Sequence, residues 1–176
     1  MKCIKVLTDA DFELETKKLD NPRARYGARG IVINQDNKIA ILNKQLKNEY
    51  KLVGGGIEEN EDPKIAFKRE VLEEAGCNIE IIKELGTIEE IKSQDNFKQL
   101  SYVFVAKAVG ELVKPEYTQK EIDEGSKLLW LEIDDAMNKI KKSEKELIAS
   151  QYESIYHTKF IVRRDYEILK YYRENY

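Results

Sequence analysis

The sequence has little of what stabilises secreted or membrane-bound proteins. Among 176 residues there are two cysteines, Cys3 and Cys77, and a single histidine. Two thiols are too few for a disulfide framework or a zinc knuckle. The longest apolar stretches, such as Leu100–Ala106, fall far short of the ~20 residues of a membrane-spanning helix, and Lys5 interrupts the apolar start of the chain where a signal peptide would lie. We therefore expect a cytoplasmic protein without membrane association.

The chain also lacks an excess of charge of either sign. It has 30 Lys and Arg residues against 33 Asp and Glu residues, a net charge of −3. A general nucleic-acid-binding protein normally carries a basic excess, so nucleic acid is not the expected partner. Hydrophobic residues make up 41% of the chain, which is sufficient for a core. We expect one domain over residues 1–176, with a core at about 26–140 and C-terminal helices at about 141–176.

Only three prolines interrupt the chain, and the hydrophobic pattern changes period along it. The segment Asp62–Ala75 has helical periodicity, with Pro63 suited to the first turn and Gly76 to the end. A polar stretch covers residues 110–127. Six shorter segments read as strands: 30–33, 39–42, 50–53, 79–91, 100–109 and 128–133. This order predicts an α/β protein with a mixed sheet.

The last forty residues are predicted to be helical. Ser143 followed by Glu146 has the spacing of a capping box and predicts the start of one helix. A second helical pattern runs from about 158 to 173. Six of the ten tyrosines follow residue 150, and we expect them to pack this helical pair onto the sheet. Stacking on a substrate, or formation of a homodimer, is the alternative role for these rings.

Acidic side chains and glycines concentrate in Gly54–Cys77, GGGIEENEDPKIAFKREVLEEAGC. Glu70, Glu73 and Glu74 share one helical face, where they repel each other and the helix dipole at the C-terminal end. A hard divalent cation such as Mg²⁺ would offset both penalties and keep positions open for phosphate oxygens. A glycine-rich turn before such a helix lets backbone groups approach a ligand closely. The alternative is a solvated charged face on which Arg69 pairs with Glu73.

The same stretch resembles the signature of the Nudix hydrolases (MutT-like proteins), G-x5-E-x7-R-E-U-x-E-E-x-G-U, in which U is a bulky apolar residue. Cys77 replaces the usual Ile, Leu or Val at the last position, a change that affects packing more than chemistry. Eight positions match at the required spacing: Gly55, Glu61, Arg69, Glu70, Val71, Glu73, Glu74 and Gly76. The resemblance covers roughly residues 26–140 and implies an α/β/α sandwich with a mixed β-sheet, here followed by a C-terminal helical extension.

The resemblance also implies a reaction and its cofactor. Nudix enzymes hydrolyse a nucleoside diphosphate linked to another group, using water and Mg²⁺ or Mn²⁺. Arg69 would orient the glutamates through salt bridges, and Glu61 would be a supporting acid. The implied metal ligands are Glu70, Glu73, Glu74 and the carbonyl of Gly55 or of the preceding Gly54. Metals of this kind offset phosphate charge and lower the pKa of bound water, which a carboxylate then deprotonates.

The general base is left open between two carboxylates. One is Glu70, and the other is an acid in the polar stretch 110–127. Glu121 and Glu124 both precede Trp130 at the distance where such an acid often lies in the family that the motif resembles, and Glu121 is our choice. Glu121 also completes a capping box with Thr118, which would be a purely structural role. We therefore predict that catalysis depends on Glu70, Glu74, Arg69 and Glu121.

Three arginines, Arg23, Arg25 and Arg29, precede or open the first core strand. The planar guanidinium group of arginine can donate two hydrogen bonds to one phosphate group, although arginines at a surface are also often merely solvated. From this cluster we predict Arg25 and Arg29 as substrate-binding residues. The single histidine, His157, lies far from the motif in sequence and is expected to be structural.

The substrate is predicted to be a small nucleotide, and its class is left open. The first interpretation is a pyrophosphohydrolase acting on a nucleoside diphosphate derivative, such as ADP-ribose or a nucleotide sugar. The alternative is a (d)NTP pyrophosphatase that cleans the nucleotide pool. A non-catalytic nucleotide-binding regulator is less favoured, because the chain keeps every metal-binding glutamate of the motif. Processing of RNA ends would require a basic groove, supported only by the arginine cluster and by Arg163 and Arg164.

Overall fold

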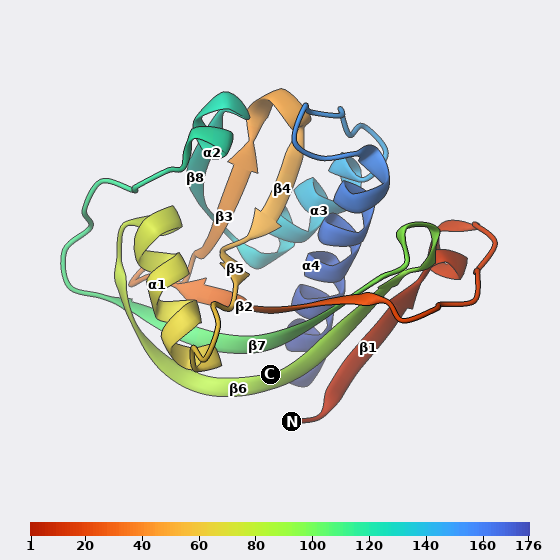
Figure 1. Cartoon of the computed structure of the whole chain (residues 1–176). Helices are drawn as coiled ribbons and strands as arrows, with labels where there is room; N and C mark the ends of the chain where they lie inside the picture. The colour runs from red at the N-terminus through yellow and green to blue at the C-terminus, as the bar shows by residue number, and fades with distance from the viewer.

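A mixed eight-stranded sheet forms the centre of the computed structural model, which describes residues 1–176 (Figure 1). The strands are β1 (Cys3–Thr8), β2 (Arg23–Ile33), β3 (Ile39–Lys44), β4 (Glu49–Leu52), β5 (Gly54–Gly56), β6 (Asn78–Lys92), β7 (Phe97–Val109) and β8 (Ser126–Leu131). The helices are α1 (Pro63–Ala75), α2 (Gln119–Asp123), α3 (Ile133–Ser143) and α4 (Ile155–Asn175). All six predicted strands are present, and β2 begins earlier than predicted, so that it includes the arginine cluster.

The sheet divides at β2. Strands β1, β6, β7 and β2 lie side by side in that order, with β1–β6 and β2–β7 parallel and β6–β7 antiparallel. Strand β2 pairs with β3 only through Ile33 and Ile39. Beyond that pair, β3 diverges together with its neighbours β4 and β8, as Figure 1 shows. Strand β5 pairs with the middle of β2 and thereby places the three glycines between the two parts of the sheet.

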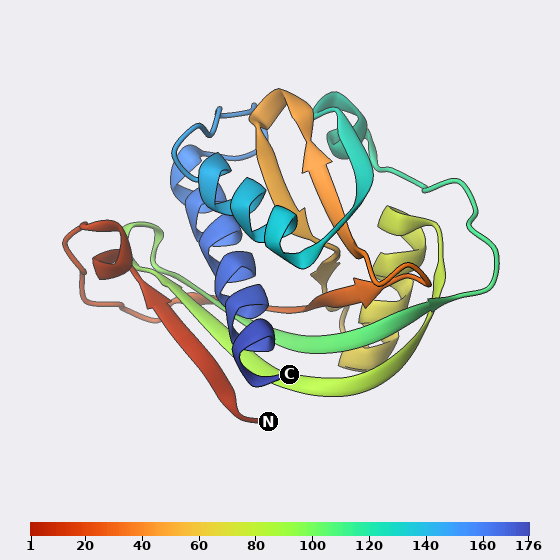
Figure 2. The same ribbon diagram turned by 180° about the vertical axis from the view of Figure 1, so that it is seen from behind.

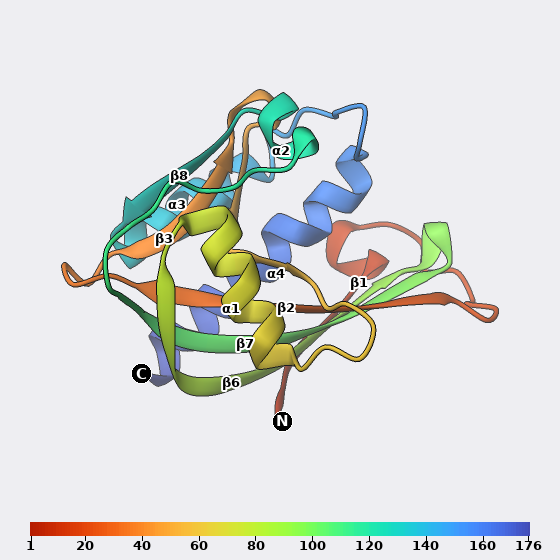
Figure 3. The same ribbon diagram turned by 60° about the vertical axis from the view of Figure 1, so that its left-hand side comes forward.

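Each face of the sheet is covered by helix. On one face α1 packs on β2 and β7, where the rings of Phe67 and Phe104 stack with centroids 5.4 Å apart. On the other face α3 and α4 lie side by side over a second hydrophobic cluster (Figure 2). Figure 3 shows α1 and α4 on opposite sides of β2 and β7. The predicted α/β/α sandwich with a mixed sheet and a C-terminal helical extension is confirmed.

Helix α1 begins and ends where its sequence signals lie. The side chain of Asp62 accepts hydrogen bonds from the backbone nitrogens of Lys64 (2.8 Å) and Ile65 (3.3 Å), and Pro63 occupies the first turn. Gly76 ends the helix with φ of 61°, a left-handed conformation that glycine adopts without strain. A Cβ atom at Gly76 would also lie 2.0 Å from the carbonyl oxygen of Val113. Both signals are local, which explains why the sequence located this helix correctly.

The helix predicted to start at Ser143 is wrong. Ser143 is the last residue of α3, a helix that the sequence did not predict, and its hydroxyl donates back to the carbonyl of Ile140 (2.8 Å). Glu146 donates its backbone N–H to Ser143, which makes a turn rather than a new helix. Beyond it, the backbone N–H of Ile148 donates to the carbonyl of Lys47, so that a tertiary contact holds this segment outside any helix.

Helix α4 begins at Ile155, three residues before the predicted start, because the Ser154 side chain caps it at the N–H of His157. The tyrosines of α4 pack this helix onto the sheet, as predicted, although the first helix of the predicted pair does not form. Four of them contact the hydrophobic cluster on that face: Tyr156, Tyr166, Tyr171 and Tyr172. No helix is both long and apolar enough to cross a bilayer.

Candidate active site

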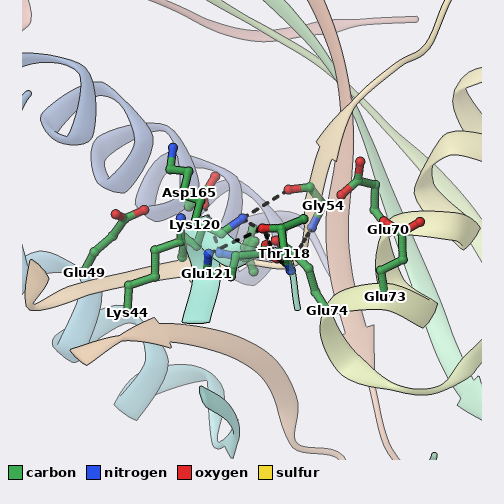
Figure 4. Close-up of polar contacts among 12 residues, drawn as sticks. Lys44, Glu49, Gly54, Glu70, Glu73, Glu74, Thr118, Lys120, Glu121 and Asp165 are labelled. Atoms are coloured by element: carbon green, nitrogen blue, oxygen red, sulfur yellow. Dashed lines mark hydrogen bonds and ion pairs between the residues drawn. The ribbon is translucent and has the colours of Figure 1, made fainter. Parts of the chain in front are cut away.

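The structure brings six of the predicted site residues to one cavity of about 230 Å³. Its walls come from strands β2 to β7, from α1, from the start of α2 and from the N-terminal half of α4. The six residues are Arg25, Arg29, Gly55, Glu70, Glu74 and Glu121. In Figure 4, Glu70 and Glu73 project from α1 on one side of Gly54, and Lys44 and Glu49 lie on the other.

Glu74 is fixed at the inner end of the cavity. Its side chain is buried, with Oε2 accepting from the backbone N–H of Gly54 (2.7 Å) and Oε1 from Lys51 Nζ (2.8 Å) (Figure 4). Lys51 also donates to the carbonyl oxygen of Gly54 (3.2 Å). Burial raises the pKa of Glu74, and the Lys51 charge and the Gly54 N–H oppose this rise. These contacts hold the carboxylate against the glycine turn in one orientation.

Arg69 connects three acids on the outer side of the same helix. Its Nε and Nη2 donate to the two oxygens of Glu61 (2.9 and 3.0 Å), a bidentate pair. Nη1 donates to Glu70 (2.9 Å) and Glu73 (3.3 Å), and Nη2 also reaches the carbonyl oxygen of Gly56 (3.0 Å). The hydrogen bonds that Arg69 donates to Glu61 and Glu70 raise its pKa, although partial burial opposes this rise. This is the contact pattern expected of an orienting residue.

Gly55 lies directly against the carboxylate of Glu70, one of the predicted metal ligands. A Cβ atom there would lie 2.3 Å from Oε2 of Glu70, closer than real Cβ contacts allow. The glycine therefore leaves the space in which the Glu70 carboxylate lies.

We expect Gly55→Ala to reduce the hydrolysis rate strongly and to change stability little. The new methyl group displaces the end of a flexible, half-buried side chain rather than the backbone, so the fold is kept while the Glu70 carboxylate moves. Rates and melting temperature are measured together on the same sample, so that a loss of rate caused by unfolding is recognised. A Gly55→Ala enzyme as fast as the wild type contradicts the placement of Glu70 in the reaction.

The donor set suits a hard divalent cation. Three carboxylates on one helix face and the carbonyl groups of the glycine turn are oxygen ligands of the kind that Mg²⁺ prefers. In this structure, however, no three acidic, histidine or cysteine side chains are arranged to hold a metal ion. Lys51 and Arg69 neutralise the carboxylates instead. Binding a metal through all three glutamates thus requires these two cations to exchange partners.

Glu121 has the structural role that its sequence offered. It lies in the first turn of α2, and its Oε2 accepts from both the backbone N–H and the hydroxyl of Thr118 (2.8 Å each). Burial opposes ionisation, but the Thr118 donors outweigh it and lower the pKa of Glu121. Because Glu121 also lines the cavity, its proposed role as general base stays a prediction.

Sequence reasoning missed the part of the cavity that α4 provides. His157, Ile161 and Arg164 all line it, and their spacing of four and three residues puts them on one helical face. His157 was expected to be structural; its Nε2 lies 2.5 Å from Oδ2 of Asp95, and its ring forms part of the cavity wall. The spacing along α4 was visible in the sequence, but nothing local indicated which surface that face would contact.

Asp165 connects α4 to the glycine turn. Its Oδ2 accepts from the backbone N–H of Leu52 (2.9 Å), two residues before Gly54, and its Oδ1 accepts from Arg164 Nε (2.7 Å). Arg164 Nη1 donates in turn to Glu90 on β6 (3.0 Å). The C-terminal helix therefore fixes the strand that leads into the site.

The arginines of β2 differ in their surroundings. Arg23 is exposed and lies over the ring of Phe97 (5.6 Å to the centroid), outside the cavity lining. Arg25 is exposed at the cavity mouth, where a Cβ atom on Gly56 would lie 2.9 Å from its Nη2. Arg29 is only 4% exposed, and its Nε donates to the Ser101 hydroxyl (3.2 Å).

Comparison with known proteins agrees with the geometry. The model of the NUDIX domain matches residues 23–151. Diphosphoinositol polyphosphate phosphohydrolase 3-alpha of Mus musculus is 32% identical over 121 residues, which are 69% of this chain and 70% of that protein. A NUDIX hydrolase from Nitrosomonas europaea has a similar structure (TM-score 0.61, 15% identity, 86% and 90% of the two chains). A MutT protein from Methanosarcina mazei Go1 is also similar (TM-score 0.54, 17% identity, 89% and 98%).

Proposed function

The chain belongs to the Nudix hydrolase family, and on this premise we propose that it hydrolyses a phosphoanhydride bond in a small phosphorylated molecule with Mg²⁺ or Mn²⁺ as its cofactor. The observation that carries the proposal is the position of Glu74 against the glycine turn, with Glu70 beside Gly55. This arrangement gathers carboxylate and carbonyl oxygens at one wall of a cavity that a phosphorylated ligand can enter.

In this proposal Glu70, Glu73 and Glu74, with the carbonyl of Gly55, hold the metal. The bound metal would neutralise phosphate charge and lower the pKa of a water molecule. The rest is done by the chain itself: the Gly54 N–H orients Glu74, and Arg69 with its partner Glu61 orients Glu70 and Glu73.

Two carboxylates qualify as the general base, which removes the proton from the attacking water. Glu70 and Glu121 both line the cavity. In each, one oxygen is engaged, Oε1 of Glu70 by Arg69 and Oε2 of Glu121 by Thr118. Each of the two carboxylates therefore has a second oxygen that can accept the proton of the attacking water.

For the substrate, the motif favours a nucleoside diphosphate derivative such as ADP-ribose or a nucleotide sugar, with a (d)NTP as the alternative. A specific observation favours a second class, a small molecule with several phosphate groups and no base. Only two of the 20 lining residues, Phe97 and Ile161, are hydrophobic, which leaves little surface on which a base could stack. The curated relative named above acts, by its name, on diphosphoinositol polyphosphates. Processing of RNA ends is disfavoured, because Arg163 is paired with Glu144 and Arg164 is buried.

The test is a hydrolysis panel with Mg²⁺ or Mn²⁺ and identification of products by mass spectrometry. The panel contains ADP-ribose, a nucleotide sugar, the dNTPs and a diphosphoinositol polyphosphate. We expect cleavage of a phosphoanhydride bond that a chelator abolishes, with the fastest member identifying the substrate class. Folded protein that turns over no member and binds no Mg²⁺ would refute the proposal.

A further inference from the structure

The cations that line the cavity differ in whether an acid neutralises them. Two of them, Arg25 and Arg29, have no carboxylate oxygen within 4 Å. The other five each lie within 4 Å of a carboxylate oxygen: Lys44, Lys51, Lys92, Lys120 and Arg164. Arg25 is exposed, so water solvates its charge. Arg29 is only 4% exposed, so water solvates its charge far less, and only from the cavity that it lines.

Arg29 is a buried cation with most of its donors unused. A guanidinium has five N–H donors, and the only acceptor bound to Arg29 is the Ser101 hydroxyl. Burial, together with the neighbouring Arg164 charge, lowers the pKa of Arg29 to about 10, so that the group is still charged at neutral pH. A buried charge is costly unless a counter-charge and hydrogen bonds compensate it. Arg29 therefore needs an anion that the chain itself does not supply.

The nearby acids Glu74, Glu90 and Asp165 act on Arg29 only at a distance, because each of them is paired with another cation. Glu90 pairs with Lys92 (3.0 Å) and Arg164 (3.0 Å). Asp165 accepts from Arg164 and from the Leu52 backbone. The buried group consequently holds four cations (Arg29, Lys51, Lys92 and Arg164) against three anions (Glu74, Glu90 and Asp165), a balance of +1.

The uncompensated charge lies next to the glycine turn. A Cβ atom on Gly27 would be 3.0 Å from Arg29 Nη2 and equally 3.0 Å from the carbonyl oxygen of Gly55. The guanidinium thus extends along β2 over Gly27, and Gly27 pairs with Gly56 of β5. An anion bound to Arg29 would be a neighbour of the carboxylate site without sharing its ligands.

We propose that Arg29, with Arg25 at the mouth, forms an anion subsite that binds a phosphate group of the substrate other than the one held at the carboxylates. The identity of its biological ligand rests on the proposed function. Binding itself occurs through direct pairing of opposite charges and needs no metal. The subsite selects substrates in which a further phosphate reaches Arg29, and this accounts for a cavity whose lining is charged rather than apolar.

The test measures binding of inorganic tripolyphosphate in EDTA by calorimetry. The wild type is expected to bind, and Arg29→Met to bind about tenfold or more weakly, because a hydrogen-bonded charge pair is lost. Arg23→Met, a change in the same strand outside the cavity lining, is the matched control and is expected to bind like the wild type. Equal affinity of wild type and Arg29→Met, or no binding by either, would overturn the subsite.

A second readout excludes a merely structural role for Arg29. In anion-free buffer Arg29→Met is expected to melt about 2–4 °C above the wild type, because an uncompensated buried charge is removed. Tripolyphosphate should then raise the melting temperature of the wild type and not that of the variant. A variant that melts well below the wild type would show that Arg29 is already compensated and would overturn the proposal. Binding of tripolyphosphate without metal is measured independently of turnover. If tripolyphosphate binds through Arg29 but no member of the panel is hydrolysed, the proposed hydrolase function is refuted and the anion subsite is not.

Discussion

Replacement of Glu74 by glutamine is expected to lower kcat by about 100-fold or more and to weaken Mg²⁺ binding, while the protein stays folded. The amide removes the negative charge that a divalent cation requires. It also has one acceptor oxygen where Glu74 uses two, one for the Gly54 N–H and one for Lys51. The measurements are steady-state kinetics over a range of Mg²⁺ concentrations and a thermal melt of the same sample.

The matched control for this change is Glu80→Gln, an exposed acid on β6 outside the cavity. It removes the same charge from the protein and is expected to leave kcat and Mg²⁺ binding unchanged. A wild-type rate in Glu74→Gln would contradict the assignment of Glu74. A low rate with unchanged Mg²⁺ binding would limit its role to orienting the glycine turn.

The largest expected loss of stability comes from Arg164→Met. Arg164 is 2% exposed and pairs with Glu90 and Asp165, so its removal leaves two buried carboxylates without their principal cation. Breaking a buried ion pair in this way costs about 3–5 kcal/mol of unfolding free energy. For a protein of this size the melting temperature should fall by roughly 6–20 °C. Denaturant unfolding and a thermal melt measure both quantities.

The matched control is Arg163→Met, the same substitution at the preceding residue of α4. Arg163 pairs with Glu144 near the surface, with 28% of its side chain exposed, and such pairs contribute about 0–1 kcal/mol. We expect this variant to unfold close to the wild type. If Arg164→Met also unfolds within about 1 kcal/mol of the wild type, Arg164 does not hold α4 against the sheet as described.

What the sequence predicted correctly depends on neighbours within a few residues. Asp62, Pro63 and Gly76 define α1 by contacts inside its own first and last turns. Glu70, Glu73 and Glu74 share a face for the same reason, because a helix fixes side chains three and four residues apart. The glycine turn and its acid-lined helix were therefore visible before the structure, as was the capping box of Thr118 and Glu121.

What the sequence missed depends on contacts between distant segments. The Asp165–Leu52 hydrogen bond joins residues 113 positions apart, and the Arg164–Glu90 pair joins residues 74 apart. No local pattern specifies which strand faces α4, so the charged face of α4 could not be assigned to the cavity. Ser143 shows the converse case, in which a local signal is overruled by a distant contact. Its capping signal predicted a helix, but the backbone N–H of Ile148 donates to the carbonyl of Lys47 and keeps the segment out of a helix. Parallel pairing of β1 with β6 is likewise set across the whole domain.

The hydrogen bond between Asp165 and Leu52 has a consequence for the order in which the protein folds. On the ribosome, the glycine turn and α1 are made long before α4, and a contact of such sequence separation forms late. Until α4 docks, the Leu52 N–H and the Glu90 carboxylate lack these partners, and one wall of the cavity is missing. We therefore expect a nascent chain that already contains every residue of the signature to be inactive until the last helix has docked.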